Sequence, residues 1–261
     1  MIVVFFASWL ALSQVNWVDI FEVRQKADAL EEKLGELIWK SIESNNDVSD
    51  KDELYNPVDS ILQKLCSANN VDRSEIKLHI VDSDEVNAFA LPDAYMVVFT
   101  GLIEETENAE ELAGVLAHEM AHIEMNHVMK KLIKEIGLSV LSSMAGGGGG
   151  EVIKEVGKVL SSSAFDRSLE KDADLKAYDY LLNSDIDPEP FANLLYRFAD
   201  LTSDYMIVSW ISTHPNPRER SAYIIESMQG PEMSFEPILA DSSWIDLKKA
   251  VGDIDYLDMP Q

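Results

Sequence analysis

The sequence has a single cysteine, Cys66, among its 261 residues. One thiol excludes an intramolecular disulfide and any zinc ribbon built from cysteines. Cys66 ends residues 61–66, whose apolar side chains recur at helical spacing, so a buried structural thiol is expected. Stability therefore has to come from a hydrophobic core, and 46% hydrophobic residues are ample for one.

Basic residues are also few: 21 Lys and Arg stand against 47 Asp and Glu, for a formal net charge of −26. Such a chain cannot readily assemble a phosphate-binding surface, which argues against nucleic acid as a partner. The acids are spread along the chain, so most of them are expected on an ordinary solvated surface. The net negative charge favours attraction of basic or unfolded protein clients.

The sequence also lacks an apolar run of about 20 residues, the length that a confident bilayer span needs. Residues 2–12 are nearly all apolar and precede the first charged side chain, Asp19. This run is typical of a signal peptide. If the apolar segment extends through Ile20, the alternative is a tilted membrane anchor. The third alternative is an N-terminal helix docked on the core. Residues 1–20 are assigned as signal peptide or anchor. This predicts a cell-envelope location, periplasmic or membrane-anchored facing the periplasm, with membrane association through the N-terminus.

The chemistry is concentrated in His118-Glu119-Met120-Ala121-His122, within a stretch free of Pro and Gly. Residues four apart share one face of a helix, so His118 and His122 can offer two imidazoles to one Zn²⁺. Glu119 can then reach a water on that metal. By chance alone the pentapeptide occurs in roughly one chain of this size in a hundred, and solvated histidines are the plain alternative. A third protein ligand is therefore required.

A later helical pattern supplies a candidate for that ligand. Glu170 and Asp174 lie four residues apart within Asp166–Leu182. Glu170 can complete a His₂Glu site with the fourth position left for water. Asp174 can accept the outward N–H of a ligating histidine and so fix its tautomer. The sequence predicts one Zn²⁺ per subunit, held by His118, His122 and Glu170.

Spacing excludes another class of third ligand. The metzincin pattern requires Gly three residues and His six residues after the second histidine, where this chain has Met125 and Val128. His127 is out of that register. On a continuous helix it lies about 140° around the axis from His122. His127 is therefore expected to support a ligand or to be structural.

Four motifs in this order resemble those of the gluzincin zinc metallopeptidase family that includes the CAAX prenyl endopeptidase, HtpX and BepA. They are Asn87-Ala88-Phe89-Ala90, the H-E-x-x-H with its trailing His127, Arg167-x-x-Glu170-x-x-x-Asp174, and His214-Pro215-x-Pro217-x-x-Arg220. The resemblance covers about residues 55–228. Where the family often has Tyr-Ser before the arginine, this chain has Phe165-Asp166, which changes no ligand. The several membrane spans of the first two branches have no counterpart, so the soluble envelope branch is favoured.

The resemblance implies a zinc-dependent endopeptidase with Glu119 as its general base. Zn²⁺ lowers the pKa of a bound water from about 15.7 towards about 7. The oxyanion also needs a donor, for which His214 and Arg220 are the candidates. His214 is alternatively a fourth zinc ligand in a resting state or a plain turn residue. Arg220 alternatively pins a carboxylate of the site helices or lies on the surface.

The strand expected at Asn87, Ala88, Phe89 and Ala90 can receive an extended substrate by strand addition. This predicts hydrolysis of peptide bonds in unfolded or misfolded proteins, as in cell-envelope quality control. Two alternatives stay open: a maturation protease with one defined substrate, and a zinc-binding chaperone or scaffold with latent proteolytic activity.

The predicted fold class is α+β, mainly α: a helical zincin-like domain with a small antiparallel sheet next to the active-site helix. A helix is expected to open at Asn56-Pro57, and residues 45–51 are expected to form a loop. Four segments are expected: residues 1–20, an N-terminal helix and linker at 21–54, the zinc metallopeptidase domain at 55–230, and a C-terminal tail at 231–261. The glycines at 146–150 predict a loop, either a lid or a surface linker. The tail either packs on the core or covers the cleft.

Overall fold

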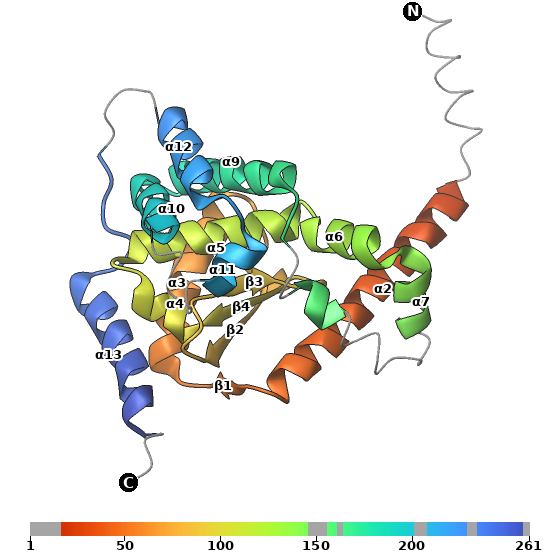
Figure 1. Ribbon diagram of the computed structural model, residues 1–261, viewed down its shortest axis with the longest axis horizontal. Coiled ribbons are helices and arrows are strands. Elements are labelled where there is room, and N and C mark those ends of the chain that lie inside the picture. The colour runs from red at the N-terminus through yellow and green to blue at the C-terminus, as the bar shows by residue number, and fades with distance from the viewer. Residues whose placement is uncertain (1–16, 146–155, 161–163, 201–207, 229–233, 258–261) are drawn as a thin grey trace, which may run out of the picture.

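The computed structural model describes residues 17–145, 156–160, 164–200, 208–228 and 234–257 (Figure 1). The expectations for the apolar run at residues 2–12 and for the glycines at 146–150 lie outside the described residues. Within the described part, no helix combines the length and the apolar character that crossing a bilayer requires.

Helices account for most of the described chain and surround a four-stranded sheet, which confirms the mainly α, α+β fold class. Before and within the sheet region lie the helices α2 (Trp17–Glu43), α3 (Asp52–Ala68), η1 (Arg73–Glu75) and α4 (Thr100–Glu105). The strands are β1 (Asp47–Ser49), β2 (Lys77–Asp82), β3 (Ala88–Ala90) and β4 (Tyr95–Phe99). The later helices are α5 (Ala109–Glu124), α6 (His127–Ile136), α7 (Leu138–Ala145), α9 (Arg167–Asn183), α10 (Glu189–Asp200), α11 (Val208–Thr213), α12 (Pro217–Ser227) and α13 (Asp241–Leu257).

The sheet has the order β1-β2-β4-β3, so β3 forms one edge. β3 and β4 form an antiparallel hairpin in which Ala88 is opposite Val98. β2 takes the other side of β4 and runs parallel to it, with His79 opposite Val97. The expectation of a wholly antiparallel sheet is therefore wrong for this pair. Apolar alternation shows where strands lie, but the direction of a pair depends on the path of the chain between them.

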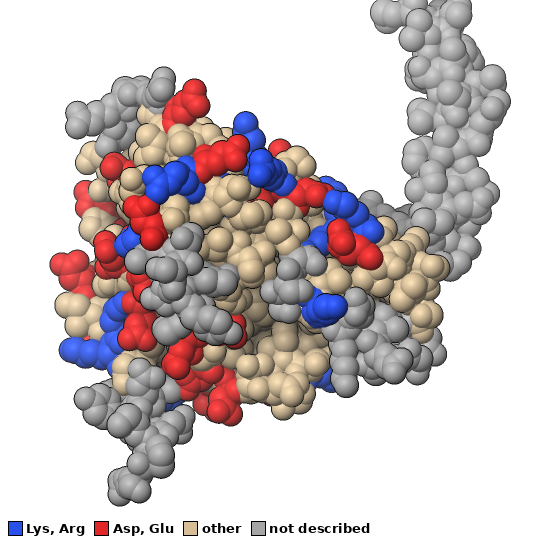
Figure 2. Space-filling model, in the orientation of Figure 1, with Lys and Arg blue, Asp and Glu red and all other residues tan. Residues whose placement is uncertain are grey.

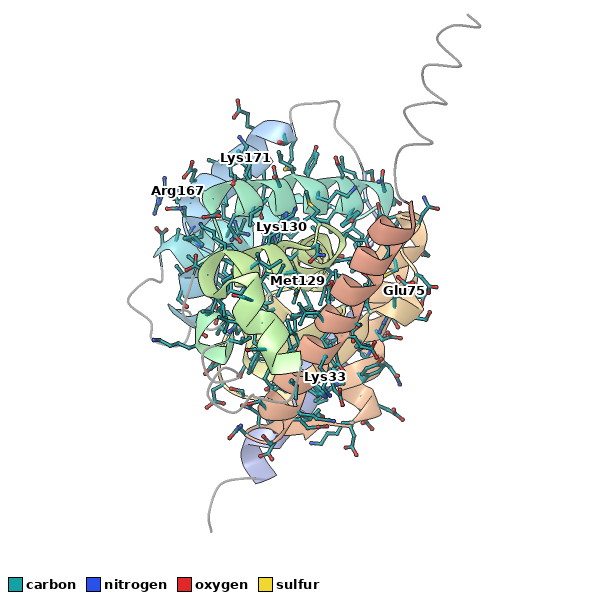
Figure 3. All side chains as sticks on the ribbon, turned by 90° about the vertical axis from the view of Figure 1, so that its right-hand side faces the viewer. Lys33, Glu75, Met129, Lys130, Arg167 and Lys171 are labelled. Carbon is teal, nitrogen blue, oxygen red and sulfur yellow. The ribbon has the colours of Figure 1, made fainter. Side chains whose placement is uncertain are left out.

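The sheet lies between two layers of helix (Figure 1). Leu78, Ile80, Met96 and Val98 share one hydrophobic cluster with α3, α5, α9 and α10. Val81, Val97 and Phe99 face the other way and share a second cluster with α2. Figure 3 looks onto the α2 side, with α6 beside α2. Residues 21–54 thus contribute α2 to the core that covers one face of the sheet.

α5 carries the H-E-x-x-H and is defined sharply at both ends. Asn108 is the N-cap, and its Oδ1 accepts the Glu111 N–H at 2.8 Å. The buried Glu111 carboxylate binds the Arg197 guanidinium through two bonds of 2.7 and 2.9 Å, which ties α10 to the start of α5. At the other end Asn126 has a left-handed backbone, with φ 53°, and ends the helix.

Two boundaries differ from expectation. The second helix begins at Asp52 and not at Pro57, which lies inside α3. Asp52 and Glu53 favour the earlier start because acidic side chains stabilise the positive end of the helix dipole. Residues 45–51 contain the short strand β1, whose pairing with β2 is a tertiary contact. The C-terminal tail packs on the core: α13 lies against α3 and α4, and Leu247 and Val251 are buried.

The packing of α10 on α5 yields a stability prediction. A Cβ added at Gly114 of α5 would lie 2.3 Å from Cβ of Phe191 on α10. Gly114→Ala is therefore expected to lower the free energy of unfolding by about 1–3 kcal/mol, as overpacking does, although Ala is the better helix former. Urea denaturation measures the change.

Gly252→Ala is the matched control, because a Cβ at Gly252 of α13 meets no atom within 4 Å. That change is expected to be neutral or stabilising by up to about 1 kcal/mol. Equal unfolding free energies for Gly114→Ala and the wild type would contradict the close approach of α10.

Candidate metal centre

Four side chains from three parts of the chain meet in one buried space beside the sheet. His118 and His122 come from α5, Glu170 comes from the first turn of α9, and His214 directly follows α11. One nitrogen or oxygen of each lies within 4.8 Å of the others, and all four residues are buried. The structure brings together the three predicted ligands and adds His214 to them.

The distances match those of a single ion site. The Nε2 atoms of His118 and His122 are 3.0 Å apart. Glu170 Oε1 is 3.4 Å from His122 Nε2, and Glu170 Oε2 is 3.8 Å from His118 Nε2. With metal–nitrogen distances of about 2.0–2.1 Å in a tetrahedral site, ligand atoms lie roughly 3.3 Å apart. The cluster therefore has the size to surround one ion.

The chemistry of the donors also fits a cation. His118 Nδ1 lies 2.9 Å from Asp174 Oδ1, so this carboxylate holds the ring proton on Nδ1 and leaves Nε2 with a lone pair. Burial, reinforced by Arg220, lowers the pKa of His118 to about 3, so the ring is neutral. This lone pair borders the space that His122 Nε2 and the Glu170 carboxylate also border, and imidazole and carboxylate donors gathered around one point suit a cation. The residues present thus fit a divalent metal ion.

His127 lies beside the site, but on a different helix from His122 and not on a continuation of α5. Because α5 ends before Asn126, His127 starts a new helix and the angle for a continuous helix does not apply. The turn places His127 Nδ1 3.1 Å from His122 Nδ1, on the side of that ring facing away from the cluster. His127 is in position to orient His122 as Asp174 orients His118.

Glu119 lies between the cluster and the edge strand β3. Its Oε2 accepts the Ala90 backbone N–H at 2.8 Å. Its Oε1 has no hydrogen-bond partner in the described chain and lies 3.5 Å from His214 Nε2. Burial raises the pKa of the Glu119 carboxyl to about 7. A carboxyl group with a pKa near neutrality is suited to taking up and returning a proton.

Arg220 neutralises the two carboxylates of α9. Its Nε and Nη2 bind the two oxygens of Asp174 at 2.8 and 2.7 Å, and its Nη1 lies 2.8 Å from Glu170 Oε2. Tyr223, one turn along α12, donates its hydroxyl to Asp174. Burial opposes ionisation, yet Arg220 and His118 hold the pKa of Asp174 at about 2. Arg220 thus makes the bidentate contact with a carboxylate that was one of its two predicted roles. Its guanidinium is bound to Asp174 and Glu170.

Aromatic residues also line the site: Trp210, which no sequence motif includes, and Phe165, which the sequence analysis named only as a departure from the family's Tyr. Trp210 stacks on His214 at 4.9 Å between ring centroids, and its other contacts include the Arg220 guanidinium at 4.8 Å. The Phe165 ring lies 4.3 Å from that of His122, and the Lys131 ammonium lies 4.2 Å from the Phe165 ring. Only Tyr223 had a usable signal, since it lies three residues after Arg220 on one helix.

The predicted substrate strand lies beside the cluster. Asn87, Ala88, Phe89 and Ala90 form β3 and the residue before it, at the edge of the sheet. The Leu91 N–H donates to Tyr95 O and the Phe99 N–H donates to Asn87 O, so these residues pair with β4. Backbone groups of the alternate residues, Ala88 and Ala90, therefore point to the free edge.

Comparison with known proteins places the chain among peptidases. A sequence profile described as Peptidase family M48 matches residues 54–227. The mitochondrial metalloendopeptidase OMA1 of Bos taurus is 26% identical over 206 residues. The metalloprotease LoiP of Escherichia coli is 29% identical over 168 residues, and the beta-barrel assembly-enhancing protease of Yersinia pestis is 30% identical over 171 residues.

These matches are partial on both sides. They cover 71%, 61% and 60% of this chain, in the order given, and 39%, 66% and 35% of the three relatives. The chain thus spans between about a third and two thirds of the length of the relatives it matches.

The arginine–carboxylate contacts yield a second prediction. Arg220→Met leaves Glu170 and Asp174 buried without their counter-charge. Loss of one partner of a buried ion pair is expected to lower the free energy of unfolding by about 3–5 kcal/mol. Urea denaturation in the presence of a chelator measures the change without a contribution from metal.

Arg218→Met on the same helix is the control. Arg218 pairs with Asp200, and both side chains are more than half exposed, so a loss below about 1 kcal/mol is expected. If the two variants lose equal stability, Arg220 does not have the neutralising role assigned to it.

Proposed function

We propose, from the premise that this chain belongs to peptidase family M48, that it is a zinc-dependent metalloendopeptidase acting on unfolded or misfolded proteins. One observation carries the proposal: the convergence of His118, His122, Glu170 and His214 on one buried point, with Glu119 beside it. Two imidazoles from one helical turn and a carboxylate from a second helix form the donor set of many catalytic zinc sites.

Zinc is the proposed ion because imidazole and carboxylate donors in a tetrahedral arrangement suit it. His118, His122 and Glu170 would hold it, with Asp174 and His127 orienting the two rings. When bound, the ion supplies a Lewis acid that polarises the scissile carbonyl and lowers the pKa of the attacking water.

Glu119 performs the proton transfers in this proposal. Its carboxylate takes a proton from the attacking water and then delivers it to the amine of the leaving peptide. The Ala90 N–H fixes one of its oxygens and leaves the other free to face the reaction. Arg220 is assigned a positioning role in place of oxyanion binding, because its guanidinium already binds Asp174 and Glu170.

His214 is proposed as the fourth metal ligand in a resting state. Its Nδ1 lies 3.1 Å from Glu170 Oε1 and 3.3 Å from His118 Nε2, which is where a fourth ligand atom would be. A histidine in this position excludes the attacking water. The site would become active when His214 moves away from this position.

The free edge of β3 is proposed to bind the substrate as an additional strand. Main-chain hydrogen bonds to Ala88 and to the carbonyl of Ala90, whose N–H already donates to Glu119, favour any extended peptide, and folded proteins rarely offer one. Figure 2 shows acidic side chains gathered on one side of a mostly uncharged centre. This charge, part of a net −26, supports attraction of basic segments.

We further propose that the protein acts in the cell envelope, periplasmic or membrane-anchored facing the periplasm. Support comes from the apolar residues 2–12 and from relatives named for β-barrel assembly. Membrane association would run through the N-terminus.

Removal of the base tests the reaction. Glu119→Gln is expected to keep zinc and to lower the rate of casein cleavage by about 10²–10⁴, which is the contribution of a positioned general base. Glu170→Ala is expected to lose much of both metal and activity. Metal content by mass spectrometry and casein cleavage are measured on the same samples.

Glu124→Gln on the exposed end of α5 is the control and should match the wild type. Full activity of Glu119→Gln, or absence of metal from a fully active wild type, would contradict the proposal. Cleavage of folded globular proteins in preference to casein would contradict the proposed substrate class.

Substitution of the fourth ligand tests the resting state. A competent minor state is typically populated at about 0.1–10%, so His214→Ala is expected to raise casein cleavage by roughly tenfold or more while zinc is retained. Steady-state cleavage rates at equal metal occupancy measure the effect. A fall in rate would assign His214 to transition-state binding instead.

A further inference from the structure

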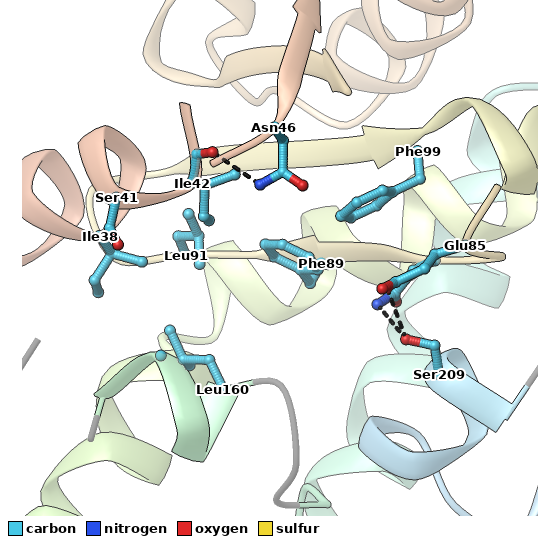
Figure 4. A pocket seen from close by; sticks show the side chains of 12 residues that line it. Ile38, Ser41, Ile42, Asn46, Glu85, Phe89, Leu91, Phe99, Leu160 and Ser209 are labelled. Atoms are coloured by element: carbon cyan, nitrogen blue, oxygen red, sulfur yellow. Dashed lines mark hydrogen bonds between the residues drawn. The ribbon is translucent and has the colours of Figure 1, made fainter. Parts of the chain in front are cut away.

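A pocket lies next to the proposed substrate edge, on the side of the sheet away from α5 (Figure 4). Phe89 of β3 and Leu91, which follows β3, form one wall, and Ile38 and Ile42 of α2 form the other. Leu160 closes it from the segment at 156–160. The cavity measures about 230 Å³.

The register of β3 connects this pocket to the active site. The Ala90 N–H points away from β4 and donates to Glu119, so the catalytic carboxylate lies at the outer edge of β3. Phe89, the preceding residue, lines the pocket. A peptide added to this edge alternates its side chains between the two faces of the sheet. Side chains on one face point towards the cluster, and those on the other face point towards the pocket.

The residues that line the pocket indicate which kind of substrate side chain it can hold. Its floor is made of aliphatic and aromatic side chains, with Phe89 and Phe99 in contact at 5.6 Å between ring centroids. A dry apolar cavity of about 150 Å³ is sufficient to hold a benzene ring. The space therefore matches one large apolar side chain, aromatic or leucine.

Polar groups at one end of the pocket suit the adjoining main chain. Asn87 donates its side-chain N–H to Ser209 Oγ at 3.1 Å, and Ser209 donates to Glu85 Oε2 at 3.1 Å. Asn87 is 5% exposed, and its Oδ1 has no partner in the described chain. This acceptor is free to bind a peptide N–H beside the apolar space.

We propose that this pocket is a specificity subsite that takes one large apolar side chain of the substrate strand. The inference rests on the proposed endopeptidase function and names the selectivity of the same site. One wall of the pocket comes from α2 (Trp17–Glu43), which precedes the residues matched to the peptidase family, 54–227. Selectivity is thus assigned to a helix outside the matched region.

The test narrows the pocket from two sides, the segment at 156–160 and α2. A Cβ at Gly157 meets no atom within 4 Å, so Gly157→Leu can extend into the cavity, and Ile42→Trp fills it from α2. Gly252→Leu is the control, because Gly252 is equally open and lies on α13. Substrates are peptides made from a casein segment that the wild type cleaves, with Phe, Leu or Ala placed at each position in turn.

We expect one position at which Phe or Leu exceeds Ala in kcat/KM by on the order of tenfold to a hundredfold, as a filled apolar pocket provides. Its immediate neighbours should show no such preference. At that position, the ratio of kcat/KM for the Phe or Leu peptide to that for the Ala peptide should fall towards one in both narrowed variants. It should stay unchanged in Gly252→Leu. Binding of the same peptides to Glu119→Gln, followed by fluorescence anisotropy, should show the same ratio.

Cleavage without any apolar preference, or a preference that persists in both narrowed variants, overturns the subsite and leaves the endopeptidase function standing. If the zinc-loaded wild type cleaves no peptide, the proposed function fails. Anisotropy then decides the subsite alone, since equal affinity for the Phe and Ala peptides overturns it.

Discussion

The site depends on the neutralisation of two buried carboxylates by one guanidinium. α9 places Glu170 and Asp174 on the same face, four residues apart, and both are almost fully buried. Two carboxylates so placed repel each other and lose their hydration. Arg220 lies against both of them, and Asp174 in turn orients His118. The arrangement of α9, α12 and α5 is therefore coupled electrostatically before any metal is considered.

α5 connects this electrostatic group to the place where a substrate would bind. One turn of the helix carries His118 and His122 towards α9 and carries Glu119 towards Ala90. The alanines of α5 and α9 at positions 117, 121, 173 and 177 are fully buried, and small side chains allow the two helices to approach closely. The same element thus positions ligands, base and edge strand.

Local patterns were sufficient for a large part of the fold and site. Helical spacing identified the two imidazoles and Glu119, and the i, i+4 carboxylates identified Glu170 and Asp174 as partners for them. The strand expected at Asn87–Ala90 coincides with β3. The parallel pairing of β2 with β4 differs from the antiparallel sheet that was expected, because the direction of a strand pair leaves little trace in local hydrophobicity. The turn at Asn126, made by a single left-handed residue, leaves as little trace. The contact of His127 with His122 follows from that turn.

The sequence by itself determined which groups carry chemistry: the donors, their spacing on helices, and the motifs that resemble a peptidase family. Only the tertiary structure decided what lies against what. It brought His214 to the cluster, set Arg220 between two carboxylates and laid α2 along the sheet to form the pocket. The reason is physical: periodicity specifies which face of an element is buried, whereas partners distant in sequence are chosen by the packing of all elements together.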